Sequence, residues 1–96
     1  MKNIISKLNK AFESRIRLGI MSILSVNDSA DFNTMKQLMD LTDGNLASHL
    51  KALEGLGYIQ STKQFIGRKP NTTYTITEEG QKAFKEHLNA LEELIR

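Results

Sequence analysis

The sequence predicts a single, mainly α-helical domain with a small β-hairpin. Apolar residues recur at the helical period of about 3.6 residues through most of the chain. Two short stretches, residues 58–62 and 72–77, instead alternate β-branched or aromatic residues with polar ones. The length of 96 residues fits one domain, 1–96, since single domains cluster near this size.

The first helix is expected over residues 13–26, before the polar run that starts at Asn27. One face of it carries branched apolar residues: Ile16, Ile20, Ile23 and Leu24. The same spacing occurs just before it, at Ile4, Ile5, Leu8 and Phe12. These four residues form either a separate helix or an extension of the first one.

A tight turn separates the next two helices. Asp31 is a candidate N-cap for a short helix over residues 32–39. Asp40 can adopt the left-handed conformation, and Thr42 can cap a third helix that continues to Gly55 or Leu56, where Gly57 ends it. The core-facing stripe of this third helix is Leu46, Leu50, Leu53 and Leu56.

The β-hairpin follows the third helix directly. Its two strands flank a polar segment that contains Gly67, Pro70 and Asn71, which predicts a long tip. Thr77 and the two glutamates after it are typical of a helix start, and that last helix reaches the C-terminus through Phe84, Leu88, Leu91 and Ile95. Two helices joined by a tight turn and followed by a hairpin match a helix-turn-helix unit with a wing.

Composition excludes several classes of function. The chain has no cysteine, so a disulfide framework, a thiolate zinc site and a cysteine nucleophile are ruled out. The chain has no Gly-x-Ser-x-Gly elbow, and no glycine-rich phosphate loop precedes any of the expected helices. No stretch approaches the roughly 18 apolar residues of a membrane helix, and residues 1–10 lack the apolar core of a signal peptide. We therefore expect a cytoplasmic non-enzyme without a cofactor or a metal.

The net charge of +2 is unevenly distributed. Basic residues exceed acidic ones at the start of the chain, and residues 61–77 contain Lys63, Arg68 and Lys69 but no acidic residue. This asymmetry is typical of a surface that faces a polyanion, although a solvated basic face would give the same counts.

The exposed face of the third helix has the character of a base-reading surface. On a helical wheel, Gly44, Ser48 and Lys51 lie opposite the leucines, and Asn45 flanks them. Asn can bind adenine bidentately and Ser can contact several bases, so Asn45 and Ser48 are the best candidates for direct readout. His49 lies at the boundary, where it either reaches a phosphate or packs.

Other polar and basic residues are expected to meet phosphate, among them Arg15 and Arg17 of the first helix. An arginine at a wing tip can also enter the minor groove. The candidate DNA contacts are Asn33, Thr34, Lys36, Asp43, Gly44, Asn45, Ser48, His49, Lys51, Lys63, Arg68, Lys69 and Thr72.

The residues that carry a family resemblance are 41–54, 57–59, 67–70, Tyr74, Thr77 and Gly80. Together they resemble bacterial and archaeal winged-helix transcriptional regulators, most closely a small MarR-like group that is also similar to the ArsR group. The resemblance covers about residues 11–90. It implies a dimeric regulator of double-stranded DNA, with the third helix in the major groove and the wing on the flanking minor groove. Metal-sensing ArsR members use cysteine pairs or His/Asp/Glu clusters, and this chain has only His49 and His87, so metal sensing is not expected.

Both ends of the chain carry apolar stripes that the small domain has little material to cover. We expect the first and last segments of two chains to pack about a two-fold axis. The candidate dimer contacts are Ile4, Ile5, Leu8, Phe12, Phe84, Leu88, Leu91, Leu94 and Ile95. The alternative is that the last helix folds back on the first helix of its own chain.

A second class of function remains open, namely a winged-helix module that binds another protein and not DNA. The small polar face of the third helix and the basic wing favour DNA, whereas an exposed apolar patch on that helix would favour the alternative. No motif identifies a small-molecule effector.

Overall fold

The computed structural model describes residues 4–96, which form six helical segments, two of them 3-10 and four of them α, and a small sheet. Two short 3-10 helices, η1 (Ile4–Lys7) and η2 (Lys10–Phe12), come first. The elements that follow, in chain order, are α1 (Arg15–Val26), β1 (Ala30–Asp31), α2 (Phe32–Met39), α3 (Asp43–Gly55), β2 (Ile59–Ile66), β3 (Lys69–Ile76) and α4 (Glu78–Leu94). The predicted mainly α class with a winged helix-turn-helix is therefore confirmed.

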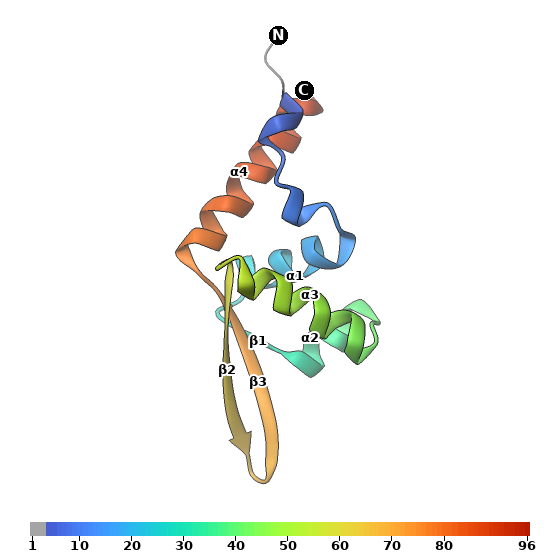
Figure 1. Cartoon of the computed structure of the whole chain (residues 1–96), viewed down its shortest axis with the longest axis vertical. Helices are drawn as coiled ribbons and strands as arrows, with labels where there is room; N and C mark the ends of the chain where they lie inside the picture. Colours follow the sequence, from blue (N-terminus) through green and yellow to red (C-terminus); the bar gives the residue numbers. More distant parts are fainter. Residues whose placement is uncertain (1–3) are drawn as a thin grey trace.

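The elements are arranged along the longest axis of the molecule, which measures 57 Å. Figure 1 shows α1, α2 and α3 in the middle, the β2–β3 ribbon projecting from one end, and α4 with η1 beside it at the other end. We call β2, β3 and their connecting turn the wing. The shape thus separates the wing tip from the end of α4.

Side-chain caps fix where the helices begin. Ser14, Asp31, Thr42 and Thr77 each accept a hydrogen bond from the backbone N–H three residues further on. The predicted caps Asp31, Thr42 and Thr77 are confirmed, while α1 begins two residues later than expected because Ser14 caps it. Asp40 has a φ of 52°, which confirms the left-handed turn between α2 and α3.

The core lies between the three central helices and the base of the wing. Leu46, Leu50 and Leu53 of α3 are buried against residues of α1, which include Ile20 and Leu24. The predicted fourth leucine, Leu56, is 49% exposed, so the stripe ends one turn earlier than expected. Leu56 is the C-cap residue, and Gly57 with a φ of 80° turns the chain away before that side chain can reach the core.

The sheet has three antiparallel strands in the order β1-β3-β2. The predicted long tip is wrong, because β2 and β3 stay paired out to Ile66 and Lys69 and only Gly67 and Arg68 connect them. Gly67, with a φ of 67°, permits this two-residue turn. Pro70 is tolerated inside β3 because β1 pairs only with Thr73 and Tyr74, so at Pro70 the strand has a neighbour on one side.

The N-terminal segment packs on α4 of the same chain. The backbone N–H of Asn9 donates to Nδ1 of His87 over 2.9 Å, and Lys7 forms an ion pair of 3.4 Å with Glu93. Phe12 meets the ring of Phe84 edge to face, with centroids 5.5 Å apart. The structure therefore shows a fold-back within one chain, as in the alternative, but the contact is made by the segment before the first helix.

The fold-back corrects part of the expected apolar stripes. Phe12 and Phe84 are 1% and 5% exposed, so the expectation that they lie on an uncovered surface is wrong. Each is buried by the other and by its neighbours within one chain. In contrast, Ile5, Leu88, Leu91, Leu94 and Ile95 are exposed, Leu8 is half-buried, and the Ile4 side chain lies outside the described residues.

Candidate nucleic-acid interface

The solvent-facing side of α3 is small and polar. Because the three leucines of α3 point into the core, Gly44, Asn45, Ser48 and Lys51 are exposed on the other side. The Thr42 hydroxyl accepts the backbone N–H of Asn45 over 3.2 Å, which fixes the first turn of the helix while the Asn45 side chain faces solvent. The predicted readout pair, Asn45 and Ser48, thus lies on an accessible surface near the helix start.

At two positions on this side of α3, contacts within the chain do not require a glycine. A Cβ atom added at Gly44 or at Gly55 would meet nothing within 4 Å. A glycine inside a helix costs about 1 kcal/mol relative to alanine. A surface without side chains at these positions lets another molecule approach the α3 backbone closely.

The start of α3 is tied to α2 by an ion pair. Nζ of Lys36 lies 2.8 Å from Oδ1 of Asp43. Both residues are expected DNA contacts, and the structure brings them together. Lys36 therefore neutralises the one carboxylate at the N-terminal end of α3, where a negative charge would otherwise repel phosphate.

His49 packs against α1. Its Nδ1 accepts a hydrogen bond of 3.1 Å from Nε of Arg17, and Nη1 of Arg17 donates to the backbone oxygen of Ala11 over 3.4 Å. Both side chains are half-buried. Of the two roles open for His49, the structure therefore shows packing, and this contact links α1, α3 and the residues before α1.

The first turn of α2 is less open to phosphate than its sequence implies. Asn33 and Thr34 are exposed, but the backbone N–H of Thr34 already donates to Oδ1 of Asp31 over 2.7 Å. Hydrogen bonds from Thr34 also lower the pKa of the Asp31 carboxyl below its usual value, so the carboxylate remains charged there. Asn33 can offer its side chain to DNA, whereas Asp31 already engages both the Thr34 side chain and the helix end.

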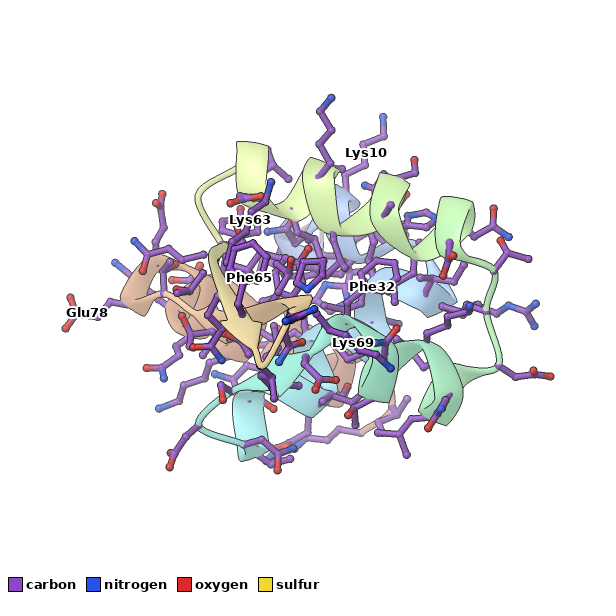
Figure 2. The ribbon with its side chains drawn as sticks, turned by 90° about the horizontal axis from the view of Figure 1, so that it is seen from below. Lys10, Phe32, Lys63, Phe65, Lys69 and Glu78 are labelled. Carbon is purple, nitrogen blue, oxygen red and sulfur yellow. The ribbon has the colours of Figure 1, made fainter. Side chains whose placement is uncertain are left out.

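The register of the wing divides its side chains between two faces. Lys63 pairs with Thr72, so both lie on one face, and Ile66 pairs with Lys69 on the other. Further along the first face, Oγ of Ser61 donates to Oε2 of Glu54 at the end of α3, over 2.6 Å. The face with Lys63 and Thr72 is therefore the one turned toward α3, and Figure 2, seen from the wing tip, shows Lys63 beside that helix.

The second face of the wing is turned toward the start of α2. Ile66, Lys69 and Asn71 line a hollow of about 230 Å³ together with Asp31 and Asn33. Arg68 occupies the turn itself and is exposed. The three wing cations thus surround the tip, with Lys63 on the α3 side, Lys69 on the α2 side and Arg68 at the end.

Metal-binding and membrane-spanning features are not found in the part of the chain that the structure describes. Residues 4–96 contain no cluster of three or more His, Asp or Glu side chains that could hold a metal ion. None of the helices in that range is long and apolar enough to cross a bilayer.

The fold, the helix-turn-helix and the wing define a winged-helix protein with a polar helix face and a basic ribbon. Residues 16–95 match the family model described as the winged helix DNA-binding domain, and the chain belongs to that family. Winged-helix transcriptional regulators are not enzymes, which agrees with the expectation of a non-enzyme. The resemblance to winged-helix transcriptional regulators found in the sequence is also confirmed.

Two proteins are similar to this chain over most of their length. An uncharacterized protein of Methanocaldococcus jannaschii is 38% identical over 79 residues, which cover 82% of this chain and 86% of the relative. The solved structure of a transcriptional regulator homologue from Pyrococcus horikoshii is 35% identical, with a TM-score of 0.77 and 94% of each chain covered.

More distant structures share the fold. The YusO protein from Bacillus subtilis is 17% identical with a TM-score of 0.81, and the match covers 96% of this chain and 64% of that one. Reduced AbfR of Staphylococcus epidermidis, solved bound to DNA, is 20% identical with a TM-score of 0.77, covering 94% and 64%.

Proposed function

We propose that the chain is a cytoplasmic, sequence-specific regulator of transcription that binds double-stranded DNA as a homodimer. In this proposal α3 lies in the major groove and the wing lies on the flanking minor groove. The observation that carries it is the adjacency of two surfaces: the small, polar side of α3 and the wing with three cations and no acidic residue.

The dimensions and chemistry of α3 suit a major groove. A helix of 13 residues is about 20 Å long, and the groove, about 12 Å wide, admits one helix. Asn45 and Ser48 would read base edges, while Gly44 lets the backbone come close. Lys51, on the same side, would meet the phosphate that borders the groove.

The wing and α2 would position the domain on the backbone. Lys63 and Lys69 are placed for phosphates on either side of the wing, Thr72 for one beside Lys63, and Arg68 for the minor groove. The helix α2 carries Asn33, Thr34 and Lys36, and Lys36 pairs with Asp43 at the start of α3. His49 would act indirectly, because it holds Arg17 and so the packing of α1 on α3.

The AbfR structure supports a duplex as the partner, since a protein with this fold was solved on DNA. The alternative, a module that binds another protein through α3, is less favoured. Between Leu46 and Leu53 the exposed residues of α3 are polar or small, and no large apolar side chain is among them.

The homodimer would use the end of α4 that extends past the body (Figure 1). Five apolar residues are exposed in that region: Ile5, Leu88, Leu91, Leu94 and Ile95. A second copy would cover them by an isologous contact, in which the same patch serves both subunits.

A salt titration tests the DNA proposal. The Kd of the wild type for random duplex DNA should rise with salt, with a slope of log affinity against log salt of about 0.9 per phosphate contact. Replacing Arg68 and Lys69 together by Ala should flatten that slope by roughly one unit per lost contact.

The matched control replaces Lys82 and Lys85 by Ala. This variant also removes two exposed cations, but from α4, and should leave the slope unchanged. A wild type that does not bind duplex DNA would contradict the proposed function and favour the protein-binding module. Binding with equal slopes for both variants would remove the wing from the interface.

A further inference from the structure

Two large apolar side chains project from the wing without cover. Phe65 is 73% exposed and Ile66 is 63% exposed. They end β2 in the outer half of a two-stranded ribbon, beyond the reach of β1. A ribbon of two strands gains little stability alone, and apolar residues on it are an aggregation hazard. Folding of this chain therefore does not explain why large apolar residues occupy these two positions.

The two side chains serve different faces of the wing. Phe65 pairs with Pro70 and shares its face with Lys63, two residues earlier on the same strand. This is the face that the Ser61–Glu54 hydrogen bond turns toward α3. Figure 2 shows Phe65 with Lys63 on that side of the ribbon. Ile66 lies on the opposite face, where it lines the hollow beside α2.

The surroundings of Phe65 indicate a negatively charged partner with an apolar interior. Residues 61–77 contain three cations and no acidic residue. A protein partner would need an acidic surface with an apolar recess, whereas the minor groove offers phosphates at its edges and stacked bases at its floor. The groove therefore fits an aromatic ring flanked by lysine and arginine better.

We propose that Phe65 is a wedge residue, which inserts between base pairs from the minor groove, unstacks one step and bends the duplex. The inference rests on the proposed function, because it needs the duplex seated on α3. Lys63 and Lys69 would hold the phosphates on either side of the opened step, and Arg68 would enter the minor groove beside the ring. Pro70, opposite Phe65, restricts the backbone there, so the ring is presented by a stiff tip.

A wedge makes a prediction about DNA sequence that charge alone does not. Pyrimidine–purine steps such as TA unstack easily, while A-tracts are stiff. An alternating A/T duplex contains many TA steps, and an oligo(dA)·oligo(dT) duplex of the same length contains none. The two probes carry equal charge and equal base composition, so a phosphate-binding wing would not distinguish them by deformability.

The experiment uses both duplexes with one adenine replaced by 2-aminopurine, whose fluorescence rises when the base unstacks. The wild type should raise the fluorescence of the alternating duplex and bind it more tightly than the A-tract duplex. Phe65→Ala should abolish the rise and weaken binding to the alternating duplex about tenfold, a typical loss for one stacking side chain. Its salt slope should not change, since no charge is removed.

Ile66→Ala is the matched control, because it truncates the adjacent exposed apolar residue on the other face of the ribbon. It should keep both the fluorescence rise and the affinity. Equal losses in the two variants would overturn the proposal and indicate a general apolar tip, such as one used on a protein. A different outcome is salt-dependent DNA binding by the wild type with no fluorescence rise, or with a rise that Phe65→Ala does not remove. Either result would overturn the wedge but leave the DNA function intact. A wild type that binds neither duplex would overturn the function itself.

Discussion

At Gly80, in the first turn of α4, another part of the backbone leaves no room for a side chain. A Cβ atom there would lie 2.9 Å from the carbonyl carbon of Tyr58 and closer still to its oxygen. The same junction is held by Thr77, whose backbone N–H donates to Tyr58 over 3.0 Å and whose hydroxyl donates to the backbone oxygen of Gly57 over 2.7 Å. One glycine thus lets the start of α4 rest on the start of the wing.

The substitution Gly80→Ala should lower the free energy of unfolding by about 2–3 kcal/mol, because the obstructing atoms belong to a hydrogen-bonded backbone that cannot move aside. Urea denaturation followed by circular dichroism measures the change. The control is Gly55→Ala, where an added Cβ meets nothing, and it should be neutral or stabilising by up to about 1 kcal/mol. Equal effects of the two substitutions would argue against the close approach.

Residues whose role depends on near neighbours in the sequence could be predicted, and those whose role depends on another element could not. The sequence identifies the caps at Asp31, Thr42 and Thr77, because a cap acts within three residues. The clash at Gly80 requires Tyr58, 22 positions earlier, to be in place. Likewise nothing local shows that His49 accepts from Arg17 and not from solvent.

At the scale of the elements, pairing decided what the sequence did not predict. The strand β1 has only two residues, too few for an alternating pattern, and it exists because β3 offers Thr73 and Tyr74 as partners. The wing tip was expected to be a loop because Gly67, Pro70 and Asn71 are typical of turns. Pairing along the whole ribbon extends the strands through these polar residues, with the result that Phe65 and Ile66 become strand residues on defined faces.

The contact between the N-terminal segment and α4 depends on a neutral histidine. His87 is 4% exposed, accepts the Asn9 backbone N–H at Nδ1, and packs against Phe12 with ring centroids 5.2 Å apart. Burial lowers the pKa of His87 below its ordinary value of 6.5, and the carboxylate of Glu13 offsets this only in part. The folded chain therefore favours the neutral ring.

This pKa shift predicts a pH dependence of stability. Since the pKa is lower in the folded than in the unfolded state, the stabilisation is complete above about pH 6.5 and is lost as the pH falls through the folded pKa. The free energy of unfolding should decrease by at most about 1.4 kcal/mol per pH unit from this group. Urea titrations between neutral pH and pH 5 measure it, and His87→Gln, which cannot titrate, should show a shallower dependence. A variant with the same slope as the wild type would show that another group is responsible.

At the scale of the whole molecule, the structure separates two surfaces that the sequence described only as apolar stripes. The inner part, with Phe12 and Phe84, is buried within one chain. The outer part, with Leu88, Leu91 and Leu94, remains exposed at the end of α4 furthest from the wing. The sequence could not divide the stripe, because every member shares the helical period and only the path of η1 and η2 decides which are covered.

If the outer part is the dimer contact, Leu88→Lys with Leu91→Lys should give a folded monomer. Lysine is chosen because added positive charge alone would raise DNA affinity, so a loss of affinity must come from lost pairing of the two subunits. Two α3 helices held about 34 Å apart would bind half-sites one turn of DNA from each other, and a monomer would keep only one of those contacts. Affinity for a duplex selected by the wild type should therefore drop steeply, while light scattering reports half the mass of the wild type.

The control variant, Val26→Lys with Leu38→Lys, places the same charges on two other exposed apolar residues, 80% and 67% exposed, and should remain dimeric. A wild type that is monomeric at tens of micromolar would contradict the dimer, and an unfolded double variant would show that Leu88 and Leu91 instead support the packing of η1 on α4.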